Sequence, residues 1–247
     1  MKSRSTWAIL LAGGVGRRMG LNKPKQLITI GGFPLIVWSF HALDEACHLD
    51  GMVVVSAAEH LAEVKTLLSE RARKAAHLVF VPGGATRQDS VRAGLAALKD
   101  ECEDVLVHDG ARPFIGAEVL ERLMVAREEA EAVIPGVAEK NTLKRVDKKD
   151  FVQMTLNRNQ VYEVQTPQLF SKALLVAAHD QAQANGFVGT DDASLVEELG
   201  EKVKVVTGDE FNLKVTTKRD IFLMKCLIAS AKSSPGSGPP QPEEPSS

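Results

Sequence analysis

Short and almost continuous apolar runs recur along the N-terminal part of the chain. They read TWAILLA, MVVVSA, HLVFVPGG, DVLVHDG and EAVIPGV at residues 6–12, 52–57, 77–84, 104–110 and 131–137. The intervening segments 34–46, 59–75, 86–100 and 116–130 carry apolar residues at spacings of three and four, as amphipathic helices do. This alternation predicts an α/β fold: a mostly parallel sheet with helices on both faces.

The pattern changes after residue 137. Residues 138–160 are polar and partly alternating, with Asp-Lys-Lys-Asp as a turn, and predict a protruding β-arm. A solvated two-stranded arm is marginally stable alone, so a second subunit is a candidate for the surface that it contacts. Helical order then resumes, with one helix from a Ser171 cap to a Gly186 stop and another from a Thr190 cap to Gly200.

A strand at 203–207 and a helix from Thr217 to about Ala231 complete a single predicted domain, residues 1–232. Residues 233–247 are rich in Pro, Ser and Gly and predict a disordered tail, because they cannot bury enough apolar surface to fold.

The composition excludes several classes of protein. The formal net charge of −2 gives no global attraction for nucleic acid or for an anionic membrane, and no apolar run is long enough to span a bilayer. Cys47, Cys102 and Cys226 form no CxxC pair, which argues against a disulfide framework and a zinc site and favours a cytoplasmic protein.

Residues 10–26, LLAGGVGRRMGLNKPKQ, form a glycine-rich segment directly behind the first predicted strand. They match neither the P-loop pattern GxxxxGK[ST] nor the dinucleotide pattern GxGxxG. Backbone N–H groups of glycines can nevertheless point at an anion, and Arg18 and Lys25 add positive charge, a combination that suits a triphosphate. The alternative is a solvated basic turn.

Two other strand ends carry polar clusters. VLVHDGARP at 105–113 contains His108, Asp109 and Arg112, and Asp109 could bind Mg²⁺ or instead cap a turn and pair with Arg112. GGATRQDSVRAGL at 83–95 could bind base or phosphate groups, with Thr86 and Asp89 as a capping box. Since parallel strands end at one edge of a sheet, these clusters should lie together.

Seven segments then resemble one family in order along the chain: LAGGVGRRM with PKQ, GGATRQDSV, VHDGARP, NTLKR, QTPQLF, GTDDASLVEELG and NLKVTT. The family is 2-C-methyl-D-erythritol 4-phosphate cytidylyltransferase. The resemblance implies a Rossmann-like nucleotidyltransferase domain and a homodimer formed through the arm. It also implies a reaction of CTP with methylerythritol phosphate, aided by Mg²⁺ or another divalent cation, that gives CDP-methylerythritol and pyrophosphate.

The resemblance also implies roles for individual residues. Arg18, Lys25 and Lys214 would be catalytic, and Asp109 would be the metal ligand. Residues expected to bind the nucleotide are Leu11, Ala12, Gly13, Gly14, Gly16, Arg18, Lys25, Gly84, Arg87, Ser90 and Asp109. Residues expected to bind the sugar phosphate are Asp109, Gly110, Arg112, Thr142, Arg158, Thr166 and Lys214, with Thr142 and Arg158 reaching across the dimer.

Ala85 and Asn141 depart from the family pattern, in which acids are frequent at both positions, but neither change removes a cation. His108 is expected to pack or position rather than act as a base, because a phosphate monoester needs none. Asp191 and Asp192 are expected to favour a helix N-terminus and to order a loop near the site. The alternatives are a ribitol 5-phosphate cytidylyltransferase and a non-catalytic nucleotide-binding module.

Overall fold

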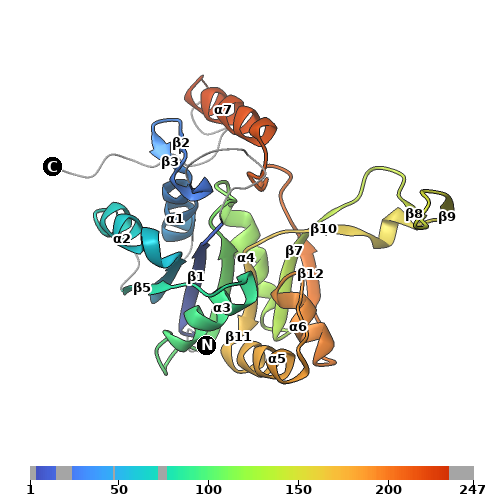
Figure 1. Ribbon diagram of the computed structural model, residues 1–247, viewed down its shortest axis with the longest axis horizontal. Helices are drawn as coiled ribbons and strands as arrows, with labels where there is room; N and C mark the ends of the chain where they lie inside the picture. The colour runs from blue at the N-terminus through green and yellow to red at the C-terminus, as the bar shows by residue number, and fades with distance from the viewer. Residues whose placement is uncertain (1–3, 15–23, 47, 72–76, 234–247) are drawn as a thin grey trace.

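The computed structural model describes residues 4–14, 24–46, 48–71 and 77–233 (Figure 1). Its centre is an eight-stranded sheet in the order β10-β7-β11-β6-β1-β4-β5, with β12 paired to β7. The parallel half consists of four strands that the apolar runs predicted: β1 (Thr6–Ala12), β4 (Gly51–Ser56), β5 (Leu78–Pro82) and β6 (Asp104–Asp109). The α/β fold with a mostly parallel sheet is confirmed.

The other half of the sheet is mixed. β11 (Gln168–Ser171) lies between β6 and β7 (Ala132–Ala138) and runs antiparallel to both, and β10 (Tyr162–Val164) is antiparallel to β7. β12 (Lys204–Thr207) is parallel to β7. The sequence did not predict β10 and β11, because their place in the sheet depends on pairing with β6 and β7.

Side chains alternate between the two faces of the sheet, as the geometry of a strand requires. In β1, Ala8, Leu10 and Ala12 join one buried cluster, which includes residues of α1 (Leu35–Ala46), α2 (Leu61–Ser69) and α4 (Ala117–Ala126). Trp7, Ile9 and Leu11 join a second cluster, with residues of α3 (Arg87–Ala96), α5 (Lys172–Asn185) and α6 (Asp192–Glu198). Helices therefore cover both faces, as predicted.

The helix caps follow the sequence with one correction. The Ser171 side chain accepts a hydrogen bond from the Leu174 N–H, and Gly186 ends α5 with φ 65°. The predicted Thr190 cap of α6 is wrong, because the cap is Asp191, whose carboxylate accepts a hydrogen bond from the Ser194 N–H. Aspartate satisfies the exposed N–H groups of the first turn with a full negative charge, which the helix dipole favours.

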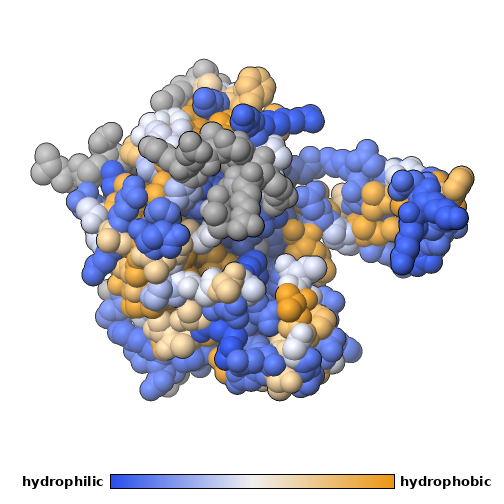
Figure 2. Space-filling view, in the orientation of Figure 1, coloured by the Kyte–Doolittle hydropathy of each residue, from blue (hydrophilic) through white to orange (hydrophobic). Residues whose placement is uncertain are grey.

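The arm projects from the body of the protein as a two-stranded hairpin (Figure 1). It consists of β8 (Lys144–Val146) and β9 (Val152–Thr155), followed by the short helix η4 (Arg158–Gln160). Phe151 and Val152 are 70% and 61% exposed. Figure 2 shows such apolar side chains on the arm among polar ones.

A third buried cluster lies beside the carboxyl end of the parallel strands. It joins α7 (Lys218–Ser233), the hairpin of β2 (Thr29–Ile30) and β3 (Phe33–Pro34), and the start of α1. The Trp38 indole N–H donates to the Ile30 carbonyl, and the Val215 N–H donates to the Ala111 carbonyl. The second bond holds the segment that carries Lys214 against the end of β6.

Two further short helices, η2 (Lys25–Leu27) and η3 (Ala58–His60), lie at the same edge of the sheet. Within the described ranges, no helix has both the length and the apolar character needed to cross a membrane.

Candidate functional site

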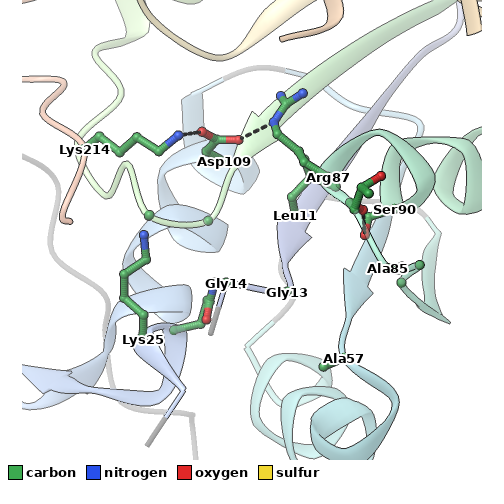
Figure 3. A pocket seen from close by; sticks show the side chains of 16 residues that line it. Leu11, Gly13, Gly14, Lys25, Ala57, Ala85, Arg87, Ser90, Asp109 and Lys214 are labelled. Atoms are coloured by element: carbon green, nitrogen blue, oxygen red, sulfur yellow. Dashed lines mark hydrogen bonds and ion pairs between the residues drawn. The ribbon is translucent and has the colours of Figure 1, made fainter. Parts of the chain in front are cut away.

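A cavity of about 300 Å³ lies where β1, β4, β5 and β6 end (Figure 3). Leu11 of β1 pairs with Val55 of β4 and Asp109 of β6, so the segments that follow these strands meet around one space. Predicted site residues that line the cavity are Leu11, Gly13, Gly14, Lys25, Gly84, Arg87, Ser90, Asp109, Gly110 and Lys214. Residues that line it without having been singled out as site residues are Gln26, Ala57, Gly83, Ala85, Thr86 and Ala111, of which Gly83, Ala85 and Thr86 belong to the segment 83–95 that was expected to bind base or phosphate groups.

Asp109 is the electrostatic centre of the cavity. Its Oδ1 accepts from Arg87 Nε at 3.2 Å, and its Oδ2 pairs with Lys214 Nζ. Although burial opposes ionisation, the charges of Arg87 and Lys214 hold the pKa of Asp109 well below its usual range. The suggested pairing of Asp109 with Arg112 is wrong, because distant segments supply both partners.

Arg87 extends from the start of α3 and bridges two carboxylates. Besides Asp109, it contacts Asp192 at the start of α6, with Nη1 2.7 Å from Oδ2. Asp192 is 1% exposed, and His179 Nε2 lies 3.2 Å from its Oδ1. Burial opposes the charge of Asp192, but Arg87 and His179 outweigh it and lower the pKa of this carboxyl.

The segment 83–90 forms one wall of the cavity, and close packing explains the glycine at position 84. A Cβ on Gly84 would lie 2.3 Å from the Asp89 Cβ. Thr86 and Asp89 form the predicted capping box, which is confirmed: the Asp89 N–H donates to the Thr86 hydroxyl and the Thr86 N–H to the Asp89 carboxylate. The Ser90 hydroxyl donates to the Thr86 carbonyl at 2.9 Å.

The glycine-rich segment is held by a residue that the sequence analysis missed. In the orientation that satisfies both its polar atoms, the buried Gln26 amide bonds to the N–H and carbonyl of Gly14, each at 2.6 Å. Lys25, its neighbour in η2, extends toward the centre of the cavity from the same side as Lys214, whereas Arg87 reaches Asp109 from the other side (Figure 3). Gly16 and Arg18 lie outside the described residues.

Behind Asp109, a buried hydrogen-bond chain orients the end of β6. The Arg112 carbonyl can only accept, so His108 Nε2, 3.0 Å away, donates to it. His108 Nδ1 then accepts from the Thr166 hydroxyl, whose oxygen accepts in turn from the Asp109 N–H. Burial lowers the pKa of His108 to about 4, so the ring is neutral near pH 7. The packing or positioning expected of His108 agrees with its burial and with these hydrogen bonds.

Five of the predicted residues do not line the cavity. Ala12 is buried in β1. Thr166 contributes through its bond to the Asp109 N–H, and the buried Arg112 donates to the carbonyls of Asn212 and Val164. Thr142 and Arg158 lie exposed on the arm, where Arg158 Nη1 donates to the Lys140 carbonyl.

The described part of the cavity wall carries three positive side chains, Lys25, Arg87 and Lys214, and one negative side chain, Asp109. No group of three or more His, Cys, Asp or Glu side chains is placed to hold a metal ion among the described residues. The glycine backbone and the positive side chains suit a polyanion. The single carboxylate of Asp109 suits a metal cation that is bound to the same polyanion.

A model of the 2-C-methyl-D-erythritol 4-phosphate cytidylyltransferase family matches residues 6–230. A protein of that name from Geobacillus thermodenitrificans is 43% identical over 223 residues, which cover 90% of this chain and 96% of the relative. One from Caldanaerobacter subterraneus is 35% identical over 90% of this chain and 97% of its own.

A solved structure, 4-diphosphocytidyl-2C-methyl-D-erythritol synthase from Anaerococcus prevotii, superposes with a TM-score of 0.82. It is 33% identical and covers 92% of this chain and 96% of its own.

Proposed function

Since this chain belongs to the 2-C-methyl-D-erythritol 4-phosphate cytidylyltransferase family, we propose that it transfers the cytidylyl group of CTP to 2-C-methyl-D-erythritol 4-phosphate. The products are CDP-methylerythritol and pyrophosphate, and the reaction is a step of isoprenoid biosynthesis. The observation that carries this proposal is the cavity at the parallel strand ends, where glycine backbone and three cations surround one carboxylate.

In this reaction an oxygen of the acceptor phosphate attacks the α-phosphorus of CTP, and pyrophosphate leaves from the opposite side. No protein nucleophile is required, because the acceptor is already anionic. The protein must bring two anions together and stabilise charge at the phosphorus, which fixed cations do well. Lys25 and Lys214 have this role within the described cavity, and Arg18 has it in the glycine-rich segment.

Different walls of the cavity bind different parts of the nucleotide. The glycine backbone at Gly13, Gly14 and Gly16 binds the phosphates, and Gln26, which bonds to the N–H and carbonyl of Gly14, fixes where Gly14 lies. The segment from Gly84 to Ser90 binds the base and ribose. Supporting this division, the Gly84 wall is a tightly packed helix start, whereas no atom of the described residues lies within 4 Å of a Cβ built on Gly13. Ala85 leaves only a methyl group where an acid is frequent, so ribose binding relies on backbone and Ser90.

Asp109 would hold Mg²⁺ or another divalent cation together with the triphosphate. Asp109 is the only carboxylate on the described cavity wall, and each of its oxygens, though paired with a cation, retains acceptor capacity. One carboxylate plus phosphate oxygens is an arrangement that Mg²⁺ accepts. When bound, the ion neutralises phosphate charge that the cations leave uncompensated.

The acceptor binds beside Asp109, Gly110 and Lys214, with Thr166 and Arg112 supporting that edge. Thr142 and Arg158 of a second subunit complete the site, and the arm of residues 138–160 forms the homodimer. The exposed Phe151 and Val152 support this use of the arm, because exposed apolar surface on a two-stranded hairpin gains stability when it is covered. The proposed pathway suits a cytoplasmic enzyme, and so does the absence of a CxxC pair among the three cysteines.

Pyrophosphate release tests the function. Purified protein is incubated with CTP and Mg²⁺, and with methylerythritol phosphate, ribitol 5-phosphate or no acceptor. Release with methylerythritol phosphate alone is expected. Release only with ribitol 5-phosphate would retain the nucleotide site and overturn the acceptor. Absence of release with either acceptor, while CTP still binds, would favour a non-catalytic nucleotide-binding module.

A further inference from the structure

Two buried residues behind the cavity wall are joined to the nucleotide site through one side chain. Asp192, the first residue of α6, and His179, in α5, are each 1% exposed, and neither lines the cavity. Asp192 bonds to His179 on one carboxylate oxygen and to Arg87 on the other. Arg87 also bonds to Asp109, so a continuous chain connects α5 and α6 to the end of β6.

The need for an N-cap of α6 does not explain why residue 192 is a buried aspartate. The cap is Asp191, whose carboxylate accepts from the Ser194 N–H and is held by the Gln168 amide at 2.7 Å. The side-chain bonds of Asp192 go to Arg87 and His179 instead. A buried carboxylate is stable only when it is paired, and here its strongest partner is a residue of the cavity wall.

The neighbouring residue strengthens the same connection. The Gln88 side chain donates to the Phe187 carbonyl and accepts from the Gly189 N–H, both at 3.2 Å. Two consecutive residues at the start of α3 are therefore tied to the segment 187–192. Arg87 Nη2 is buried and has no hydrogen-bond partner among the described residues, so its guanidinium retains unused N–H donors.

We propose that Asp192 and His179 are a positioning pair for Arg87, and that they hold the first turn of α3 where nucleotide binding requires it. This proposal rests on the proposed function, because its kinetic test measures the use of CTP. Neither residue touches the nucleotide: each acts through Arg87. A guanidinium shared between two carboxylates is held in one orientation, and the wall segment 84–90 moves with it.

The test uses Asp192→Asn, which keeps the size of the side chain and removes its charge. The KM for CTP should rise about tenfold, the effect of weakening one charged hydrogen bond, while kcat changes less than about threefold. In an Arg87→Ala background the same substitution should raise the KM less than about twofold further, because the residue through which it acts is gone.

Asp104→Asn is the matched control. Asp104 is also a buried carboxylate paired with an arginine, Arg127 at 2.9 Å, but it lies at the opposite end of β6. Asp104→Asn should lower the free energy of unfolding and leave the KM for CTP unchanged. Should Asp192→Asn fail to fold, His179→Phe serves instead, because it keeps a ring and removes only the bond to Asp192. His179→Phe should raise the KM for CTP less than Asp192→Asn does, and this rise should also vanish in the Arg87→Ala background.

Hydrogen exchange of peptides that cover residues 83–90, measured without nucleotide, separates this proposal from the proposed function. Faster exchange in Asp192→Asn than in Asp104→Asn supports the positioning pair even in a protein with no cytidylyltransferase activity. Equal exchange in the two variants would overturn it, as would a KM effect of the same size with and without Arg87.

Discussion

Asp109→Asn tests the description of the cavity at its electrostatic centre. The Asp109 side chain is 11% exposed, whereas the side chains of its partners Arg87 and Lys214 are 30% and 41% exposed. Breaking a fully buried ion pair costs about 3–5 kcal/mol. Since both cations here can turn toward water, we expect a loss of about 2 kcal/mol of unfolding free energy, near the value of a charged hydrogen bond.

The loss should depend on pH with a definite sign. The native pKa of Asp109 lies below its value in the unfolded chain, so its contribution is fully present at neutral pH. The contribution fades as pH falls through the unfolded value, about 3.9, toward the lower native value. Asparagine does not titrate, so the stability difference between wild type and variant should narrow below about pH 4.

Urea unfolding of wild type and Asp109→Asn at pH 7 and at several values between pH 5 and pH 3 measures this difference. The exposed Asp100→Asn serves as the control for loss of an unpaired surface charge. A difference that is the same at every pH would refute the assigned ion pairs. So would a variant as stable as wild type at pH 7.

Four further substitutions test the nucleotide site and the arm. Lys25→Ala should lower kcat about a hundredfold to a thousandfold, the cost of one well-placed charge donor, and unchanged turnover at saturating CTP would contradict its role. Gly84→Ala places a Cβ 2.3 Å from the Asp89 Cβ and should cost about 1–3 kcal/mol in thermal unfolding. Gly13→Ala meets no atom of the described residues within 4 Å, so it should leave stability unchanged and weaken CTP binding in calorimetry. From the proposed dimer contact of the arm, we expect Phe151→Asp to raise the dissociation constant of self-association at least tenfold in analytical ultracentrifugation, and an unchanged constant or a monomeric wild type would contradict that contact.

The place of the site could be predicted because it depends on a general property of parallel strands. Apolar runs identified β1, β5 and β6, each followed by glycine together with a charged residue. Parallel strands bring such ends to one edge, and the cavity lies there. The short strands β10 and β11 were missed because their position depends on pairing with β6 and β7.

The partners of the charged residues could not be predicted, because local spacing is a poor guide to them. Arg112 follows Asp109 by three residues, yet it bonds to carbonyls 100 and 52 residues away. Asp192 was explained by its place at a helix N-terminus, but its side chain is directed to Arg87, 105 residues away. Gln26 ends the PKQ segment, but its position there indicates no role, and only the fold shows that it holds Gly14.

Asp109 places a negative charge at the centre of a site that is proposed to bind two anions. Its ion pairs give a physical reason for this charge. Arg87 and Lys214 would repel each other if Asp109 did not lie between them. The carboxylate thus holds both cations in place before a triphosphate arrives, and their ordering costs less when the nucleotide binds. In the Asp109→Asn protein Arg87 keeps its bond to Asp192, whereas Lys214 loses the carboxylate that holds it and becomes mobile. The protein should therefore still bind CTP. Its main defect should appear in kcat, because catalysis depends on where the charge of Lys214 lies.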